Sequence, residues 1–206
     1  DEGAYGKVNE KEKEIFNNID VSNERLIKLV DEFLNVSRIE QGRTQYNFAE
    51  MDFAAMSEGV ITELREKAGP KNVSLELKIQ AGVKKVEADE ERIRHCLYNF
   101  VDNAIKYSPE NTTIKTFVEK SKNGIQARVV DQGVGLDDKD LKNLFQKFYR
   151  SPHVIRDIQG TGLGLFVVKQ FAEAHGGKVW VKSAGVGKGS EFGFWIPVKR
   201  GKRKGE

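Results

Sequence analysis

The chain has 206 residues, 38% apolar and 32% charged, which suits one domain with an appendage or two small domains. Its 34 basic and 31 acidic residues leave a net charge of only +3, which argues against a nucleic-acid partner. A single cysteine excludes an internal disulfide and favours a reducing compartment, so we expect a cytoplasmic location. The sequence shows no signal-peptide pattern and no apolar run of 18 residues, so we expect no membrane span within it, although an upstream region of a longer protein could be a membrane anchor.

The first predicted element is a long helix from about Glu10 to Gln41, with Gly42 at the position of a C-terminal cap. Its apolar residues recur at spacings of three, four and seven, which is typical of an amphipathic helix. No other segment offers a helix of matching length. The apolar stripe therefore predicts dimerisation, or packing against a helix that is not in this sequence.

After this helix, the pattern alternates between helices and strands. In chain order we expect an extended link at 46–53, a helix at 52–68, strands at 73–79 and 85–88, a helix at 89–107, a hairpin at 114–119 and 125–130, helices at 138–148 and 163–175, and strands at 178–182 and 191–198. Asp52 and Asp89 are expected to cap their helices. The fold class is therefore α+β: a two-layer α/β sandwich with a mixed sheet of about five strands and helices on one face, preceded by the long helix.

Three clusters of residues have the chemistry of a ligand site. In the first, Asn99 and Asn103 are four residues apart and share one face of the predicted helix at 89–107. Their amide oxygens could hold a hard cation such as Mg²⁺, and Lys106 on the next turn could reach a phosphate. The alternative interpretation is an ordinary polar helix face.

The second cluster, Asp131, Gly133 and Gly135, follows an apolar strand. A carboxylate at the end of a buried strand could accept a hydrogen bond from an exocyclic amine such as that of adenine. The alternative is a turn in which the aspartate bonds its own backbone and glycine supplies a positive φ.

The third cluster is Gly160-Thr161-Gly162-Leu163-Gly164, at the start of a predicted helix. Glycines let backbone N–H groups approach a ligand, and a helix N-terminus favours phosphate. Close packing of a loop on a helix would explain the same glycines without a ligand.

Considered jointly, these clusters and two more motifs have the order and spacing of one known family. The additional motifs are Phe145-x-x-Phe148-Tyr149-Arg150 and Gly187-x-Gly189-Ser190. The chain resembles the catalytic ATP-binding domain of bacterial sensor histidine kinases, a Bergerat-type fold shared with Hsp90, gyrase B and MutL. The resemblance covers nearly the whole sequence.

The resemblance implies that ATP and Mg²⁺ are the cofactors. Asn103 would bind Mg²⁺ with support from Asn99, and Lys106 would meet the phosphates. Tyr107 would border the adenine, and Asp131 would accept a hydrogen bond from its amino group. The wall beside Asp131 would be shaped by Gly133 and Gly135.

The same resemblance implies a catalytic Arg150 that reaches the γ-phosphate together with Lys106. Phe145 and Phe148 would anchor the root of a mobile lid at 151–159. The backbone N–H groups of the glycine-rich segment would hold phosphate, with contributions from Gly160, Thr161, Gly162, Leu163 and Gly164.

By resemblance, residues 1–46 are part of the dimerisation and phosphotransfer region, with only the second helix of its hairpin. Residues 47–200 are the catalytic domain, and 201–206 are a basic tail. The expected partners are a second subunit, a helix with the phosphoacceptor histidine, and a response regulator. None of His95, His153 and His175 is followed by the acid and Arg-Thr-Pro of the family's acceptor motif. We therefore expect a protein-histidine kinase catalytic fragment that does not phosphorylate itself. The alternatives are a catalytically silent nucleotide-binding interaction module and a chaperone-type or DNA-repair-type ATPase.

Overall fold

The computed structural model describes residues 8–83, 85–152 and 160–199, and the chain divides into two units at residues 1–44 and 45–206. The first unit is helix α1 (Glu10–Glu40). Asn9 and Glu12 form a capping box at its start, and Gly42 follows its end with φ of +64°. The predicted long helix is thus confirmed. Its exposed apolar side chains are Ile15, Phe16, Ile19, Val21, Leu26, Ile27, Leu29, Val30, Phe33 and Leu34.

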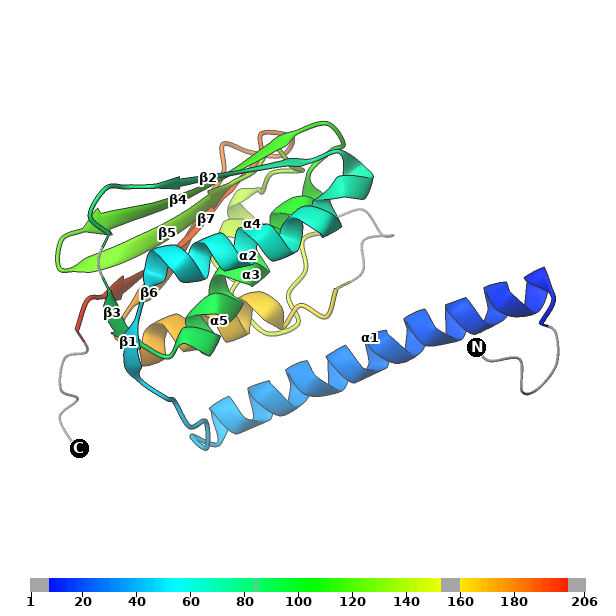
Figure 1. Ribbon diagram of the computed structural model, residues 1–206, viewed down its shortest axis with the longest axis horizontal. Coiled ribbons are helices and arrows are strands. Elements are labelled where there is room, and N and C mark those ends of the chain that lie inside the picture. Colours follow the sequence, from blue (N-terminus) through cyan, green and yellow to red (C-terminus); the bar gives the residue numbers. More distant parts are fainter. Residues whose placement is uncertain (1–7, 84, 153–159, 200–206) are drawn as a thin grey trace. The chain divides into compact units, whose positions relative to one another are not determined.

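The second unit is built on a five-stranded sheet with the order β2-β4-β5-β7-β6 (Figure 1). β2 pairs with β4 in parallel and every other pair is antiparallel, so the sheet is mixed. The strands are β2 (Ser74–Ile79), β4 (Thr113–Ser121), β5 (Gly124–Val130), β6 (Lys178–Lys182) and β7 (Glu191–Pro197). Helices α2 (Phe53–Ala68), α3 (Glu90–Tyr107) and α5 (Gly164–Ala174) cover one face, as the sequence predicts.

Aspartate side chains mark where α2 and α3 begin. Asp52 accepts hydrogen bonds from the N–H groups of Ala54 and Ala55 at the start of α2, and Asp89 accepts one from Arg92 N–H at the start of α3. Helix α2 ends at Ala68, the boundary predicted from the sequence, and the 3₁₀ turn η1 (Gly69–Lys71) follows it.

The predicted strand at 85–88 lies outside the main sheet. It is β3 (Val86–Ala88), and it pairs with β1 (Ala49–Met51), which forms within the predicted extended link. His175, at the end of α5, accepts a hydrogen bond from Asp89 N–H at its Nε2, 3.0 Å away, and its ring lies against those of Tyr46 and Phe48. The contacts of His175 therefore link three parts of the second unit: its first residues, the start of α3 and the end of α5.

The helix predicted at 138–148 is wrong in its length, because α4 spans only Asp138–Asn143. Five residues later, Phe148 has φ of +61°, a left-handed conformation that no α-helix accommodates. Its N–H donates instead to Gly162 O over 2.9 Å, a partner far along the chain. A long-range backbone contact thus overrides the local helical pattern.

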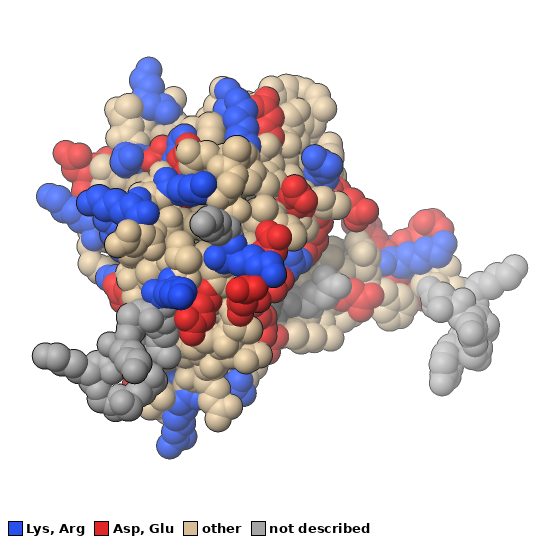
Figure 2. Space-filling view, turned by 60° about the vertical axis from the view of Figure 1, so that its left-hand side comes forward, with Lys and Arg blue, Asp and Glu red and all other residues tan. Residues whose placement is uncertain are grey.

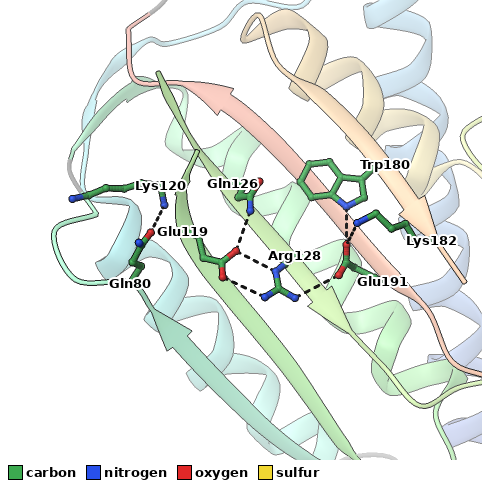
Figure 3. Close-up of polar contacts among 8 residues, drawn as sticks. All are labelled: Gln80, Glu119, Lys120, Gln126, Arg128, Trp180, Lys182 and Glu191. Atoms are coloured by element: carbon green, nitrogen blue, oxygen red, sulfur yellow. Dashed lines mark hydrogen bonds and ion pairs between the residues drawn. The ribbon is translucent and has the colours of Figure 1, made fainter. Parts of the chain in front are cut away.

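Side chains along the sheet strands alternate between the buried face, which packs against the helices, and the solvent-exposed face. Buried apolar residues face the helices, among them Ile114, Val118, Ile125, Ala127, Phe194 and Ile196. The other face carries a polar network, shown in Figure 3, in which Arg128 bridges Glu119 and Glu191. Glu191 also accepts hydrogen bonds from Trp180 Nε1 and Lys182 Nζ. The alternation of apolar and polar residues explains why one face is covered and the other is not.

Basic and acidic side chains are mixed over the face of the molecule that Figure 2 shows. This matches the nearly balanced charge of the sequence. Within the described part of the chain, no helix has the length and apolar character needed to cross a membrane.

Candidate functional site

Helix α3 presents the asparagine pair on one face. Asn103 Nδ2 donates to Asn99 Oδ1 over 3.0 Å, and both side chains are half-buried. The bond uses the amide nitrogen of Asn103 and leaves its carbonyl oxygen available for a ligand. A Cβ placed on Gly164 would lie 2.5 Å from Asn99 Nδ2, so the asparagine pair sits directly against the start of α5.

The carboxylate of Asp131, 7% exposed at the end of β5, is held by three hydrogen bonds. Gly133 N–H and Ser190 N–H donate to Oδ1 over 2.7 and 3.2 Å, and the Ser190 hydroxyl donates to Oδ2. The backbone-bonded turn and a ligand role are therefore compatible, because Oδ2 keeps a lone pair for an exocyclic amine. Burial raises the pKa of Asp131, while the hydrogen bonds from Ser190 and Gly133 oppose that rise.

Gly133 and Gly135 are required by close backbone contacts. A Cβ on Gly133 would lie 2.7 Å from Tyr107 O, so this segment abuts the end of α3. Gly135 has φ of +64° and is packed against the Gly185 carbonyl. The turn at 185–189 is tied to the same segment, since Gly189 N–H donates to Gly133 O over 3.1 Å.

The glycine-rich segment leads into the N-terminus of α5. Leu163 is the N-cap residue, and no side-chain cap bonds the first N–H groups of the helix. These N–H groups and the helix dipole suit an anion. A Cβ on Gly160 would lie 3.8 Å from Tyr107 Oη and 4.0 Å from Arg150 Nε, so three predicted site residues converge here.

Lys106, which the sequence predicts could reach a phosphate, is part of an ion pair. Its ammonium pairs with Asp102 Oδ2 at 2.6 Å. Asp102 also pairs through Oδ1 with Lys67 of α2. Burial favours a higher pKa for Asp102, but the ion pairs with Lys106 and Lys67 outweigh burial and lower the pKa below its usual 3.8.

The segment around Arg150 is fastened to α4 by Asp140, which is fully buried. Tyr149 Oη and Ser151 Oγ donate to the two oxygens of this carboxylate over 3.0 and 2.7 Å. Arg150 lies between these two donors, and its own side chain is exposed. Phe145 is half-buried, whereas Phe148 is 64% exposed, so Phe148 is held in place through its backbone and not by packing.

Most of the predicted lid, residues 153–159, lies outside the described residues, as does His153. Of the other two histidines, His175 is buried in structural contacts and His95 packs on the ring of Phe171. These contacts agree with structural roles for both.

The donor set fits Mg²⁺ bound chiefly through a nucleotide. No group of three His, Cys, Asp or Glu side chains that could chelate a metal occurs among the described residues. Mg²⁺ prefers oxygen ligands and is commonly held by one or two protein groups with substrate phosphates. Asn103 Oδ1, bonded through its amide nitrogen to the Asn99 side chain that lies against Gly164, has the chemistry of such a ligand.

The structure thus gathers all of the predicted segments into one unit: the asparagine face of α3, the Asp131 turn and the glycine-rich start of α5. Two contributors were not assigned a role from the sequence. Ser190 belonged to a motif already noted, and its spacing of 59 residues from Asp131 hid the contact. Asp140 offered only a capping signal within α4.

This combination of fold and site defines a Bergerat-type ATP-binding domain. Residues 88–200 match the family described as histidine kinase-, DNA gyrase B-, and HSP90-like ATPase, and the chain belongs to this family. Within it, the domain is the ATP-binding catalytic portion of the sensor histidine kinase type, as the following relatives indicate.

The circadian input-output histidine kinase CikA of Synechococcus elongatus is 32% identical over 94% of this chain, which covers 26% of that protein. Full-length ShkA, solved in complex with AMPPNP, shares the fold with a TM-score of 0.81 and 24% identity, over 96% of this chain and 41% of ShkA. The histidine kinase ThkA, solved in complex with the response regulator protein TrrA, has a TM-score of 0.74 and 26% identity, over 97% of this chain and 55% of ThkA. The chain therefore spans only part of each relative.

Proposed function

We propose that this chain binds Mg-ATP and transfers the γ-phosphoryl group to a histidine on a phosphotransfer helix. The observation that carries the proposal is the convergence of three segments. Asn99 touches Gly164, Tyr107 O abuts Gly133, and the Tyr107 hydroxyl lies near Gly160 and Arg150. These contacts bring together three groups: a carboxylate that can accept a hydrogen bond from an amine, a helix start that can bind phosphate, and an amide oxygen that can bind a cation.

In this proposal, each end of the nucleotide has its own contacts. Asp131 Oδ2 accepts from the adenine amino group, and Gly133 and Gly135 form the wall beside it. The N–H groups of Thr161, Leu163 and Gly164, with those of Gly160 and Gly162, surround the phosphates. Tyr107 borders the base.

Phosphoryl transfer depends mainly on positioning and on stabilising charge. Asn103 would hold Mg²⁺ with Asn99 behind it, and the cation would offset the charge of the phosphate oxygens. Arg150 and Lys106 are the proposed catalytic residues, since each can place a positive charge at the transferred group. The acceptor imidazole forms a bond to phosphorus as the bond to the ADP oxygen breaks.

The partners follow from the same reasoning. ThkA was solved with a response regulator, which supports a response regulator as the partner of this chain too. The exposed apolar stripe of α1 supports a homodimer through this helix. We assign 1–46 to the dimerisation and phosphotransfer region, 47–200 to catalysis and 201–206 to a basic tail. A cytoplasmic site of action suits the single buried cysteine.

The test mixes the chain with Mg-ATP labelled at the γ position and a separate domain that carries a histidine followed by an acid and Arg-Thr-Pro. Label should appear on that domain, and an acceptor with His→Gln should stay unlabelled. Tight ATP binding without transfer would instead support the silent interaction module. Gel filtration over a range of concentrations tests dimerisation, with Leu26→Glu as the variant expected to remain monomeric.

A further inference from the structure

One buried carboxylate on α3 is shared by two lysines from two helices. The side chain of Asp102 is 6% exposed, and the residue directly precedes Asn103. Its Oδ2 pairs with Lys106, one turn later on α3, at 2.6 Å, and its Oδ1 pairs with Lys67 near the end of α2. Two ammonium groups and one carboxylate give this cluster a net charge of +1. A single cation would suffice to neutralise the carboxylate.

Lys67 is important because Lys106 is expected to leave Asp102 when the nucleotide binds. It follows Asn103 by three residues and so lies beside the asparagine face, with its side chain 30% exposed. In the proposed function it binds the nucleotide phosphates. To do so it must leave Asp102. If Lys67 were absent, this departure would leave the buried carboxylate without a cation, which is strongly destabilising. The carboxylate would then oppose nucleotide binding.

We propose, on the basis of the proposed function, that Lys67 is a positioning residue for ATP binding: it neutralises Asp102 while Lys106 is transferred to the phosphates. Lys67 contacts a different carboxylate oxygen from Lys106, so its ion pair persists when Lys106 departs. Asp102 acts as the resting site of Lys106. The two lysines are therefore not redundant, since one moves and the other stays.

This role is distinct from tying α2 to α3. A second ion pair, between Glu63 of α2 and Arg94 of α3, joins the same two helices away from Asp102. Arg94→Met therefore provides a matched control, because it removes a cation from an α2–α3 ion pair without touching the cluster.

The experiment measures the Kd of Mg-ATP by calorimetry and that of adenosine, which lacks phosphates, by NMR titration. The variants are K67M, K67R, D102N, K106M and the double variant K67M/D102N, each checked by circular dichroism. K67M should weaken Mg-ATP binding by about tenfold and no more than K106M does, while adenosine binding changes less than about twofold. K67R and Arg94→Met should retain the affinity of the unsubstituted chain.

The decisive comparison is the effect of Lys67 when Asp102 carries no charge. In the D102N background, K67M should change the affinity for Mg-ATP by less than about twofold, because no buried charge is left to neutralise. An equal loss in both backgrounds would mean that Lys67 contacts phosphate directly, and an equal loss for ATP and adenosine would mean a purely structural role. Either result overturns the proposal while the proposed function stands. If the unsubstituted chain binds no ATP, or K106M binds it normally, the site assignment itself fails and this inference fails with it.

Discussion

Asn103 donates its side-chain amide to Asn99 over 3.0 Å, and this bond orients the oxygen of Asn103 away from its neighbour. Asn99 in turn lies against Gly164 at the start of α5. The proposed cation ligand and the proposed anion-binding helix start are therefore linked by one pair of contacts.

Asn103→Ala should remove the side-chain oxygen that is proposed to bind Mg²⁺. We expect Mg-ATP affinity to fall by about tenfold, and the affinities measured with Mg²⁺ and with a chelator to become similar. Calorimetry in the two conditions checks this. Asn18→Ala, on exposed α1, is the control and should retain the dependence on Mg²⁺. A full Mg²⁺ effect in Asn103→Ala would show that another residue holds the cation.

Gly162→Ala tests the phosphate-binding segment. Gly162 has φ of +74°, and a Cβ there would lie 2.7 Å from the carbonyl carbon of Phe148. The segment must shift, so ATP affinity should fall by about tenfold or more. Gly42→Ala is matched in backbone conformation, with φ of +64° and nothing within 4 Å of the added Cβ. It should cost about 1 kcal/mol of local stability and leave ATP binding intact. Equal ATP affinity in both variants would contradict the assignment.

Asp140→Ala should free both ends of the segment that carries Arg150. The substitution removes one hydrogen bond from Tyr149 and one from Ser151, at a cost of about 1–3 kcal/mol of stability. We expect kcat for phosphoryl transfer to decrease more than ATP affinity, because in the proposed function Arg150 acts on the transferred group. Asp138→Ala, an exposed residue on the same helix, should change neither quantity. A decrease in ATP affinity with unchanged kcat would contradict the prediction, because Asp140 would then support nucleotide binding and not phosphoryl transfer.

The network in Figure 3 predicts a pH-dependent stability. Hydrogen bonds from Arg128 lower the pKa of Glu119 below 4.5. At Glu191, burial favours a higher pKa. The hydrogen bonds from Lys182 and Trp180, together with the charges of Lys182 and Arg128, outweigh burial and lower the pKa of Glu191. The unfolded chain then binds more protons between the unfolded and folded pKa values, so this stabilisation is present above the unfolded pKa and is lost as pH falls through the folded pKa.

Arg128→Met should therefore be less stable than the unsubstituted chain at pH 7, by about 1 kcal/mol, and should lose less stability on acidification to about pH 3. Urea unfolding at a series of pH values measures both effects. Lys85→Met removes an exposed ion pair with Glu50. Its free energy of unfolding should match that of the unsubstituted chain at pH 7 and at every other pH measured. Parallel pH curves for Arg128→Met and the unsubstituted chain would contradict the prediction.

Much of the fold is readable from local sequence. Asp52 and Asp89 mark helix starts because a short acidic side chain bonds the first N–H groups, and the strands at the sheet centre alternate between apolar and polar residues. The prediction failed at 144–148, where the residues favour a helix but Phe148 is held in a left-handed conformation by Gly162. A partner so distant leaves no local signal.

The sequence by itself determined the type and order of the elements, the amphipathic stripe of α1 and the residue types of the nucleotide motifs, because each depends on neighbours within one or two turns. Only the tertiary structure decided that Ser190 bonds Asp131, that Asp140 fastens the chain on both sides of Arg150, and that Asp102 stands between lysines of two helices. These contacts depend on which faces pack together. A buried carboxylate needs donors, and the fold brings them from segments that are far apart in the chain.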